Sequence, residues 1–159
     1  MRYLITSILI TLLASSAMAK EIKTEILINA SPTKVWSILT DFDNYPNWNQ
    51  FIKSIIGNVK IGNKITTRIK PPETKEMTFK PKVLTYQVNK EFSWIGHLLF
   101  TGLFDGKHKF ELIDNGNGTT TFRQSEKFKG ILVWMFNAEN TKKGFEKMNE
   151  KLKIMAEKK

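Results

Sequence analysis

The chain has 159 residues, no cysteine and a formal net charge of +10. Because it has no cysteine, it forms neither disulfides nor thiolate metal sites, and packing of one core must stabilise it. The excess of lysine is spread along the sequence, whereas nucleic-acid binding needs clustered basic residues with stacking aromatic residues. We therefore expect no nucleic-acid partner and, at most, transient contact with an anionic membrane surface.

The N-terminus has the pattern of a secretory signal peptide over residues 1–19. A short positive start at Met1-Arg2 is followed by Tyr3–Ser16, which is apolar or hydroxylated and has no charge. Ala17-Met18-Ala19 then supplies the small residues that signal peptidase requires. We expect cleavage before Lys20 and export to the periplasm or the medium; a retained N-terminal anchor is the alternative.

The mature chain, residues 20–159, suits a single domain. Its first predicted strand is Glu21–Asn29, where apolar residues alternate with charged ones. Ser31-Pro32 is typical of a helix start, and a short amphipathic helix is expected as far as Leu39. A second short helix is predicted at Asn47–Phe51.

A run of strands follows the two short helices. Turn residues at Gly62-Asn63 and a double proline at Pro71-Pro72 mark the ends of the first two strands, and Asn115-Gly116-Asn117-Gly118 indicates a tight hairpin between the last two. The strands predicted here are 52–59, 64–70, 77–88, 91–97, 107–113 and 119–128.

The last segment, Ile131–Lys158, has the pattern of one long amphipathic helix. Its apolar positions recur at helical spacing, and lysine and glutamate fill the other face. The apolar positions are Met135, Ala138, Phe145, Met148, Leu152 and Met155. An antiparallel sheet with a long helix packed on one face is an α+β arrangement.

Several segments resemble the SRPBCC superfamily of START-like and polyketide cyclase-like proteins. They are Ile28–Trp36, Leu39–Asn49, Gly106–Leu112, Ser125–Gly130 and Gly144–Glu150. The resemblance spans residues 20–159 and implies a helix-grip fold, in which a curved antiparallel sheet of about six or seven strands wraps around a long C-terminal helix, with two short helices after the first strand. It also implies an internal cavity for a hydrophobic small molecule. Relatives often have histidine where this chain has Gln124; if that histidine is a catalytic base in some of them, this chain has lost it.

Strand alternation places polar residues on the inner face of the sheet. His108 shares a face with Phe110, and Gln124 and Glu126 share a face with Phe128. A buried polar group without a partner costs about 1–3 kcal/mol, so a solid core would rarely contain three such residues on neighbouring strands. We therefore predict that His108, Phe110, Gln124 and Glu126 contact a ligand; a His–Glu pair that only fixes the hairpin is the alternative.

Aromatic residues are expected to complete the cavity wall. Those in or beside the strands are Phe79, Phe92, Trp94, Phe100 and Phe104, although ordinary core packing would also explain them. The loop 98–104 is apolar around a central glycine, where a solvated loop should be polar. This loop is expected to be a lid of the cavity or a docking patch for a membrane or partner.

The sequence thus favours binding or carriage of a lipid, isoprenoid or aromatic polyketide-like molecule. One alternative is a cyclase or dehydratase that uses Glu126 and His108 as acid and base. Another is an envelope protein-interaction module without a ligand. Because no nucleophilic cysteine and no metal-ligand spacing is present, we assign no catalytic residue and expect no metal or cofactor; the ligand and the oligomeric state are not specified.

Overall fold

The computed structural model describes residues 19–158, so the predicted signal peptide, apart from Ala19, lies outside the described residues. Regular elements follow one another from the first described residue to the last. They are β1 (Ala19–Ile28), α1 (Pro32–Leu39), the 3₁₀ helix η1 (Phe42–Asn44), α2 (Tyr45–Trp48), β2 (Ile52–Ile56), β3 (Thr66–Ile69), β4 (Met77–Phe79), β5 (Lys82–Gln87), β6 (Glu91–His97), β7 (Asp105–Asp114), β8 (Thr120–Lys129), the 3₁₀ helix η2 (Val133–Met135) and α3 (Ala138–Glu157).

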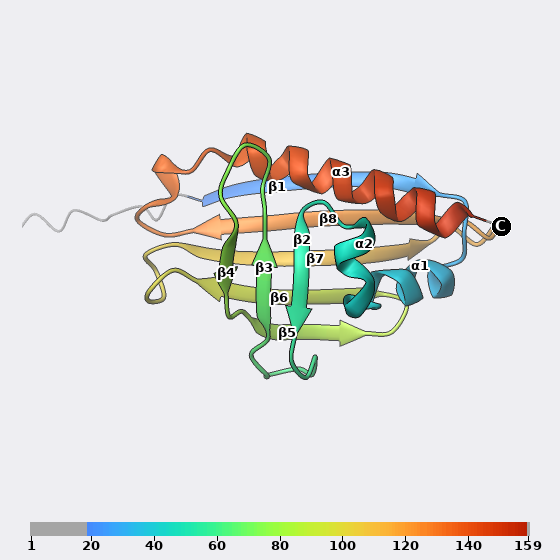
Figure 1. Cartoon of the computed structure of the whole chain (residues 1–159), viewed down its shortest axis with the longest axis horizontal. Coiled ribbons are helices and arrows are strands. Elements are labelled where there is room, and N and C mark those ends of the chain that lie inside the picture. The colour runs from blue at the N-terminus through green and yellow to red at the C-terminus, as the bar shows by residue number, and fades with distance from the viewer. Residues whose placement is uncertain (1–18, 159) are drawn as a thin grey trace, which may run out of the picture.

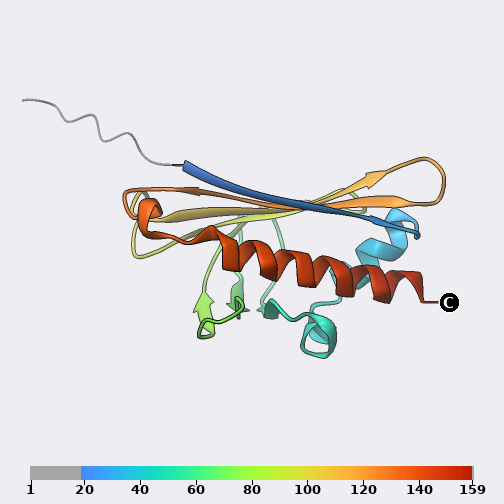
Figure 2. The ribbon, with the colours of Figure 1, turned by 90° about the horizontal axis from the view of Figure 1, so that it is seen from above.

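The described strands form two antiparallel sheets. The larger sheet has the order β1-β8-β7-β6-β5, and the smaller one has the order β2-β3-β4. Helix α3 and the smaller sheet lie on the same face of the larger sheet, with α3 running along β1 and β8 and the smaller sheet crossing the other strands (Figures 1 and 2). The predicted α+β helix-grip architecture is therefore confirmed.

The number of strands and sheets differs from the prediction because of Pro81. A single strand was expected over 77–88, but a proline has no backbone N–H to donate to a ladder. The chain is accordingly divided into β4, which pairs with β3, and β5, which pairs with β6. An expected single sheet of six or seven strands becomes two sheets with eight strands within the described residues.

Two of the three helix predictions needed a shift in their bounds. The second short helix covers Tyr45–Trp48 rather than 47–51. Helix α3 begins at Ala138 rather than Ile131, because the side chain of Asn137 caps it by accepting a hydrogen bond from the Glu139 N–H at 3.0 Å. Met135, expected on the buried face of this helix, is 65% exposed.

The core lies between the larger sheet and α3. One face of α3 is fully buried, with Phe145, Met148 and Leu152 at the helical spacing that the sequence predicted. Gly144 lets the ring of Phe51 lie directly against the helix, where a Cβ atom would collide with it.

No helix within residues 19–158 is long and apolar enough to cross a membrane.

Candidate functional site

The strand register brings the inward residues of four strands into two adjacent rows across the larger sheet. The first row consists of Trp94 on β6, His108 on β7, Glu126 on β8 and Ile22 on β1. The second row consists of Phe92, Phe110, Gln124 and Thr24 on the same strands. Because side chains alternate along each strand, polar and aromatic groups of both rows face α3 together.

His108 contacts both other polar residues of the predicted set. Its Nδ1 atom lies 3.5 Å from Glu126 Oε2, and its Nε2 atom lies 3.2 Å from Gln124 Nε2. Gln124 is fully buried, His108 is 2% exposed, and the Glu126 side chain is 15% exposed. Gly106 leaves room for this carboxylate, since a Cβ atom there would lie 2.7 Å from Glu126 Oε1.

The imidazole of His108 lies in an aromatic setting. It stacks on Trp94 with ring centroids 4.7 Å apart, and the ring of Phe145 from α3 meets it edge-on at 4.9 Å. The Gln124 amide lies within hydrogen-bond distance of Nε2, whereas Nδ1 approaches Glu126 Oε2 at an ion-pair distance. Both ring nitrogens therefore face polar groups of the chain itself, which is the arrangement that a hairpin-fixing pair requires.

Two buried acceptor atoms close to this group have no partner. Gln124 Oε1 and Asn149 Oδ1 accept no hydrogen bond from any group of residues 19–158, although Gln124 is fully buried and Asn149 is 2% exposed. The two residues are linked through Thr24, whose hydroxyl accepts from Asn149 Nδ2 at 3.0 Å and donates to the Gln124 backbone oxygen at 3.4 Å. Each unpartnered acceptor destabilises the fold by about 1–3 kcal/mol. The site thus has unused capacity to accept hydrogen bonds.

Sequence reasoning missed Asn149 and Thr24. The available signal was that Asn149 lies four residues after Phe145 and three before Leu152, so a polar side chain falls on the apolar face of α3. Nothing in the pattern indicates its partner Thr24, which is 125 residues away in sequence.

The predicted aromatic wall is packed on itself. Phe92, Trp94 and Phe110 are at most 2% exposed, and their rings contact one another with centroids 5.0–5.9 Å apart. In this structure the three rings form part of the core beside His108. Their role in ligand binding stays a prediction.

The remaining aromatic residues of the predicted set lie apart from His108. Phe79 is partly buried on β4, where its ring covers Gly96. Phe104 is partly buried against Phe128, with ring centroids 5.5 Å apart. Phe100 is 61% exposed, so its expected place in a cavity wall is wrong. It lies in a connection where Leu98 and Leu99 are also exposed, whereas Phe104 is partly buried.

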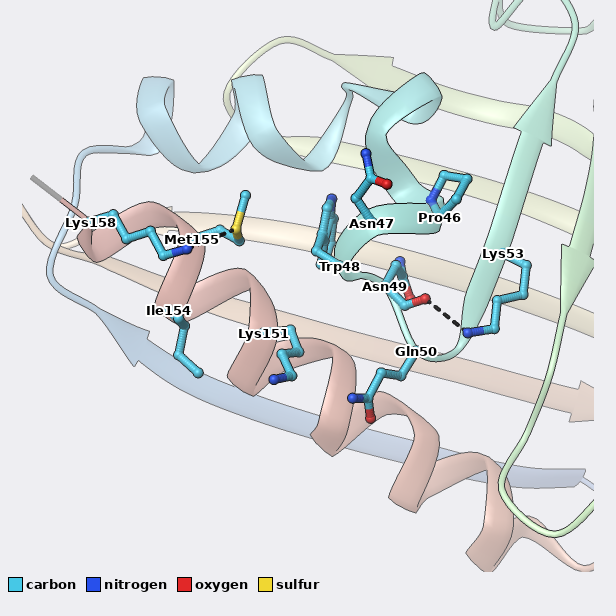
Figure 3. Close-up of a pocket in the computed structure, with 10 residues that line it drawn as sticks. All are labelled: Pro46, Asn47, Trp48, Asn49, Gln50, Lys53, Lys151, Ile154, Met155 and Lys158. Carbon is cyan, nitrogen blue, oxygen red and sulfur yellow. Dashed lines mark hydrogen bonds between the residues drawn. The ribbon is translucent and has the colours of Figure 1, made fainter.

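A surface pocket of about 300 Å³ separates α2 from the C-terminal half of α3 (Figure 3). Trp48 and Met155 stand on opposite sides of it, and its polar rim includes Lys53, whose Nζ donates to the Asn49 backbone oxygen at 3.3 Å. Trp48 Nε1 and Asn49 Nδ2 are buried and have no hydrogen-bond partner in the described part of the chain. The lining residues are Pro46, Asn47, Trp48, Asn49, Gln50, Lys53, Lys151, Ile154, Met155 and Lys158.

This pocket was not foreseen, because its two walls are about a hundred residues apart in sequence. Burial raises the pKa of Tyr45, the residue before Pro46 of this pocket. The Tyr45 hydroxyl therefore stays protonated, and it donates to the Leu39 backbone oxygen at the end of α1.

Within residues 19–158, no group of three His, Asp or Glu side chains could hold a metal ion.

Comparison with known families places this fold and site in context. Residues 19–157 match the model of the family described as polyketide cyclase / dehydrase and lipid transport. The chain belongs to this family. The match confirms the SRPBCC assignment that the sequence motifs indicated. Comparison with curated proteins gives no match.

Solved structures share the fold of this chain. A protein from Chromobacterium violaceum is 13% identical, with a TM-score of 0.69, over 87% of this chain and 98% of that one. A START superfamily protein from Mycobacterium smegmatis is 17% identical, with a TM-score of 0.61, over 86% and 94%. Norcoclaurine synthase from Thalictrum flavum, in complex with dopamine and hydroxybenzaldehyde, is 13% identical, with a TM-score of 0.61, over 91% of each chain. These identities establish the fold alone.

Proposed function

We propose that this protein binds a neutral, largely apolar small molecule that carries a hydroxyl group, between the larger sheet and α3. The observation that carries the proposal is the pair of buried acceptors without partners, Gln124 Oε1 on the sheet and Asn149 Oδ1 on the helix. A hydroxyl placed between the sheet and the helix donates to one of them and removes its desolvation penalty.

The surrounding groups specify the charge of the ligand. The polar atoms around Gln124 belong to His108, Glu126 and the Thr24–Asn149 pair, and their described hydrogen bonds and ion pairs include no lysine or arginine. A carboxylate placed there would be buried beside the Glu126 carboxylate and the unpartnered amide oxygens, with no lysine or arginine among the described contacts to pair with it, which is unfavourable. A phenol, sterol-like alcohol or isoprenoid alcohol is therefore preferred to a fatty acid.

Access of a ligand to Gln124 requires movement of the Met148 side chain on α3. Met148 lies over the amide of Gln124, with its sulfur 3.7 Å from Gln124 Nε2. Methionine is flexible and unbranched, so rotation of this side chain exposes the amide at low cost. The aromatic rings of Trp94, Phe110 and Phe145 then offer the apolar surface that small-molecule sites usually have.

The family context supports this reading. Its description names lipid transport, and norcoclaurine synthase, a structural neighbour, was solved with dopamine and hydroxybenzaldehyde.

We propose that the protein acts in the cell envelope, as the N-terminal pattern predicts. Purification from the native host should then yield a chain that begins at Lys20, measured by mass spectrometry; a cytoplasmic chain that keeps Met1 would contradict this placement.

A matched pair of probes tests the ligand class. Pyrenebutanol and pyrenebutyric acid share an apolar body and differ in the head group. We expect saturable binding of the alcohol, weaker binding of the acid, and about tenfold lower affinity for the alcohol in Gln124→Met or Asn149→Leu. Each variant removes one unpartnered acceptor but also takes the donor from a buried neighbour, His108 Nε2 in Gln124→Met and the Thr24 hydroxyl in Asn149→Leu, so the two effects on stability should largely offset and both variants should stay folded.

Ser125→Ala is the control for these variants. Ser125 is the next residue on β8 and faces the opposite side of the sheet, so this change should leave probe affinity unaltered. Equal binding of acid and alcohol, or equal losses in all three variants, would contradict the proposal. Absence of saturable binding would favour the protein-interaction module.

A second candidate function is a cyclase or dehydratase. The specific observation is the contact between His108 Nδ1 and Glu126 Oε2, two groups able to move a proton beside a bound molecule. Mass spectrometry of the ligand before and after incubation distinguishes the two functions. A chemically altered ligand, and a loss of that change in Glu126→Gln, would establish the enzyme.

A further inference from the structure

Two chain connections lie side by side at one end of the molecule. One is the loop 98–104 between β6 and β7, and the other is the segment 130–137 between β8 and α3 (Figures 1 and 2). Their backbones are joined, since the Ile131 N–H donates to the Gly102 oxygen at 3.1 Å and the Leu132 N–H donates to the Leu103 oxygen at 3.0 Å. They therefore form one surface.

This surface, the docking end, is apolar where solvent should favour polar residues. Each connection contributes three large apolar side chains that are more than half exposed. They are Leu98 (52%), Leu99 (85%), Phe100 (61%), Ile131 (63%), Trp134 (62%) and Met135 (65%). A cluster of exposed apolar side chains on a folded domain marks a contact site for a membrane or another molecule.

Contacts of Asp105 stabilise the conformation of the loop 98–104. The Asp105 carboxylate accepts hydrogen bonds from the Gly102 N–H at 3.1 and 3.0 Å and lies 2.6 Å from His97 Nδ1. Leu99, at the tip, has a φ angle of +62°, a conformation that disfavours residues with a Cβ atom. An exposed leucine in this conformation stabilises neither the backbone nor the core. Its presence therefore favours a contact with an apolar surface outside the chain.

Lysines flank the docking end on the outer face of the sheet. Lys107 and Lys127 are directly opposite each other on β7 and β8, an arrangement that normally destabilises a sheet. Lys127 lies 3.6 Å from Glu21, whereas Lys107 and Lys129 have no ion pair within residues 19–158. Positive charge beside exposed apolar side chains complements an anionic lipid surface.

The most apolar stretch of the sequence joins the fold at the same place. Residues 3–16 precede Ala19, and Ala19 is paired with Lys129, next to the segment that begins at Gly130.

We propose that the docking end binds the surface of a bilayer that contains anionic phospholipid. Trp134 suits the interface between headgroups and acyl chains, because its ring is apolar with a polar N–H. A protein partner fits less well, since lysine is depleted in protein interfaces and three lysines flank this surface. A second copy of the chain and residues 3–16 themselves are the other candidate occupants.

Vesicle flotation tests the proposal with the chain 19–159, which contains every described element. We expect binding to vesicles of phosphatidylglycerol and phosphatidylethanolamine, reduced by salt, and weaker binding to phosphatidylcholine alone. The double variant Leu99→Glu, Trp134→Glu should bind at least about tenfold less. Ile61→Glu, which alters a side chain that is 59% exposed on the β2–β3 turn, is the matched control and should bind normally.

Two single variants separate the apolar and electrostatic contributions. Leu99→Asn should weaken binding to all vesicles while the melting temperature stays constant or rises, because asparagine tolerates a positive φ. Lys129→Glu should weaken binding to the anionic vesicles only. Trp134 also reports the contact directly, since Trp36, Trp48 and Trp94 are buried, so vesicles should shift its emission to the blue.

Defined outcomes would overturn the proposal. They are absence of binding by the chain 19–159 at low salt, or equal loss in the Ile61→Glu control. A dimer that the Leu99 and Trp134 changes dissociate would assign the surface to a second copy. A blue-shifted Trp134 without vesicles in the chain 1–159, but not in 19–159, would assign it to residues 3–16. The inference is independent of the proposed ligand: the docking variants should keep pyrenebutanol affinity, and Gln124→Met should keep vesicle binding.

Discussion

The inner polar group and the docking end depart from ordinary packing in opposite directions. The first buries Gln124 and Asn149, each with an unpartnered acceptor, where apolar side chains would be more stable. The second exposes Leu99 and Trp134 where polar side chains would be better solvated. A chain selected for stability alone would have neither arrangement. Under the two proposals made above, each region is adapted to a molecule outside the chain, a polar group in one case and an apolar surface in the other.

The two regions also differ in how they are held. The inner group belongs to strands and to α3, so its side chains are fixed by register and by packing on both sides. The docking end belongs to connections, and two backbone hydrogen bonds between 102–103 and 131–132 keep its halves together. Substitutions should therefore affect stability mainly in the first region and surface binding mainly in the second.

The largest effect should come from removing a buried ring of α3. Phe145→Ala should lower the free energy of unfolding by about 3–5 kcal/mol, and Leu152→Ala by about 2–5 kcal/mol, since both side chains are fully buried. Trp134→Ala should change it by no more than about 0.5 kcal/mol. Urea denaturation measures all three. If Trp134→Ala were as destabilising as Phe145→Ala, the docking end would be part of the core and the comparison would fail.

A smaller effect is expected where the two connections of the docking end meet. Gly130 has a φ angle of +133°, and a Cβ atom there would lie 2.5 Å from the Leu103 backbone oxygen. Gly130→Ala should destabilise the protein by about 1–3 kcal/mol and weaken vesicle binding, because the connections can no longer approach. Gly116→Ala, where a Cβ atom would meet nothing within 4 Å, controls for the backbone strain alone. Equal vesicle binding by both variants would show that the pairing of the connections is dispensable.

The regular part of this comparison could be predicted from the sequence. β6 has the expected bounds, Glu91–His97, and alternation along β7 and β8 correctly placed His108 and Gln124 on the inner face. Period-2 patterns are reliable here because one face of each strand is buried, so a shift by one residue would expose the whole apolar set.

The docking end was only half predicted. The sequence indicated the apolar loop 98–104. The other connection was predicted as part of the long helix, because Met135 lies three residues before Ala138 and the helical spacing of apolar residues continues through η2. The capping residue Asn137, followed by Glu139 in the first turn, was the signal for the true start of α3. The pairing of 102–103 with 131–132 depends on tertiary contacts between distant segments, which periodicity does not contain.

Glu126→Gln sharpens the comparison within the inner group. The amide keeps the shape and much of the hydrogen bonding to His108, so pyrenebutanol affinity should change by about tenfold or less, near 1.4 kcal/mol. If Glu126 is a general acid or base, turnover of the bound ligand should fall by about 10²- to 10⁴-fold while binding survives. Loss of stability with unchanged affinity would mean that the pair only fixes the hairpin. Vesicle binding should be unaltered in every case.

The smallest effect should come from Glu157, at the end of α3 that lies opposite the docking end. Its Oε1 atom accepts a hydrogen bond from the Asn29 N–H at 2.7 Å and lies 3.0 Å from Lys153 Nζ. The Asn29 hydrogen bond, and then the Lys153 contact, lower the pKa of this carboxyl below its ordinary value. The carboxylate therefore binds fewer protons in the folded than in the unfolded chain. Its contribution to stability is present above the pKa of the unfolded state and is lost as the pH falls through the folded-state pKa.

Glu157→Gln removes that contribution and its pH dependence. The wild type should melt slightly above the variant at neutral pH, and the two melting temperatures should converge in acid. Glu150→Gln, an exposed glutamate on the same helix, should show no such convergence. Because Glu157 joins α3 to the end of β1, its loss loosens the helix that covers Gln124, so pyrenebutanol should exchange faster. Vesicle binding should be unaffected, since the docking end is attached through the other end of α3. A parallel loss of vesicle binding would mean that α3 couples the two regions, and their independence would have to be abandoned.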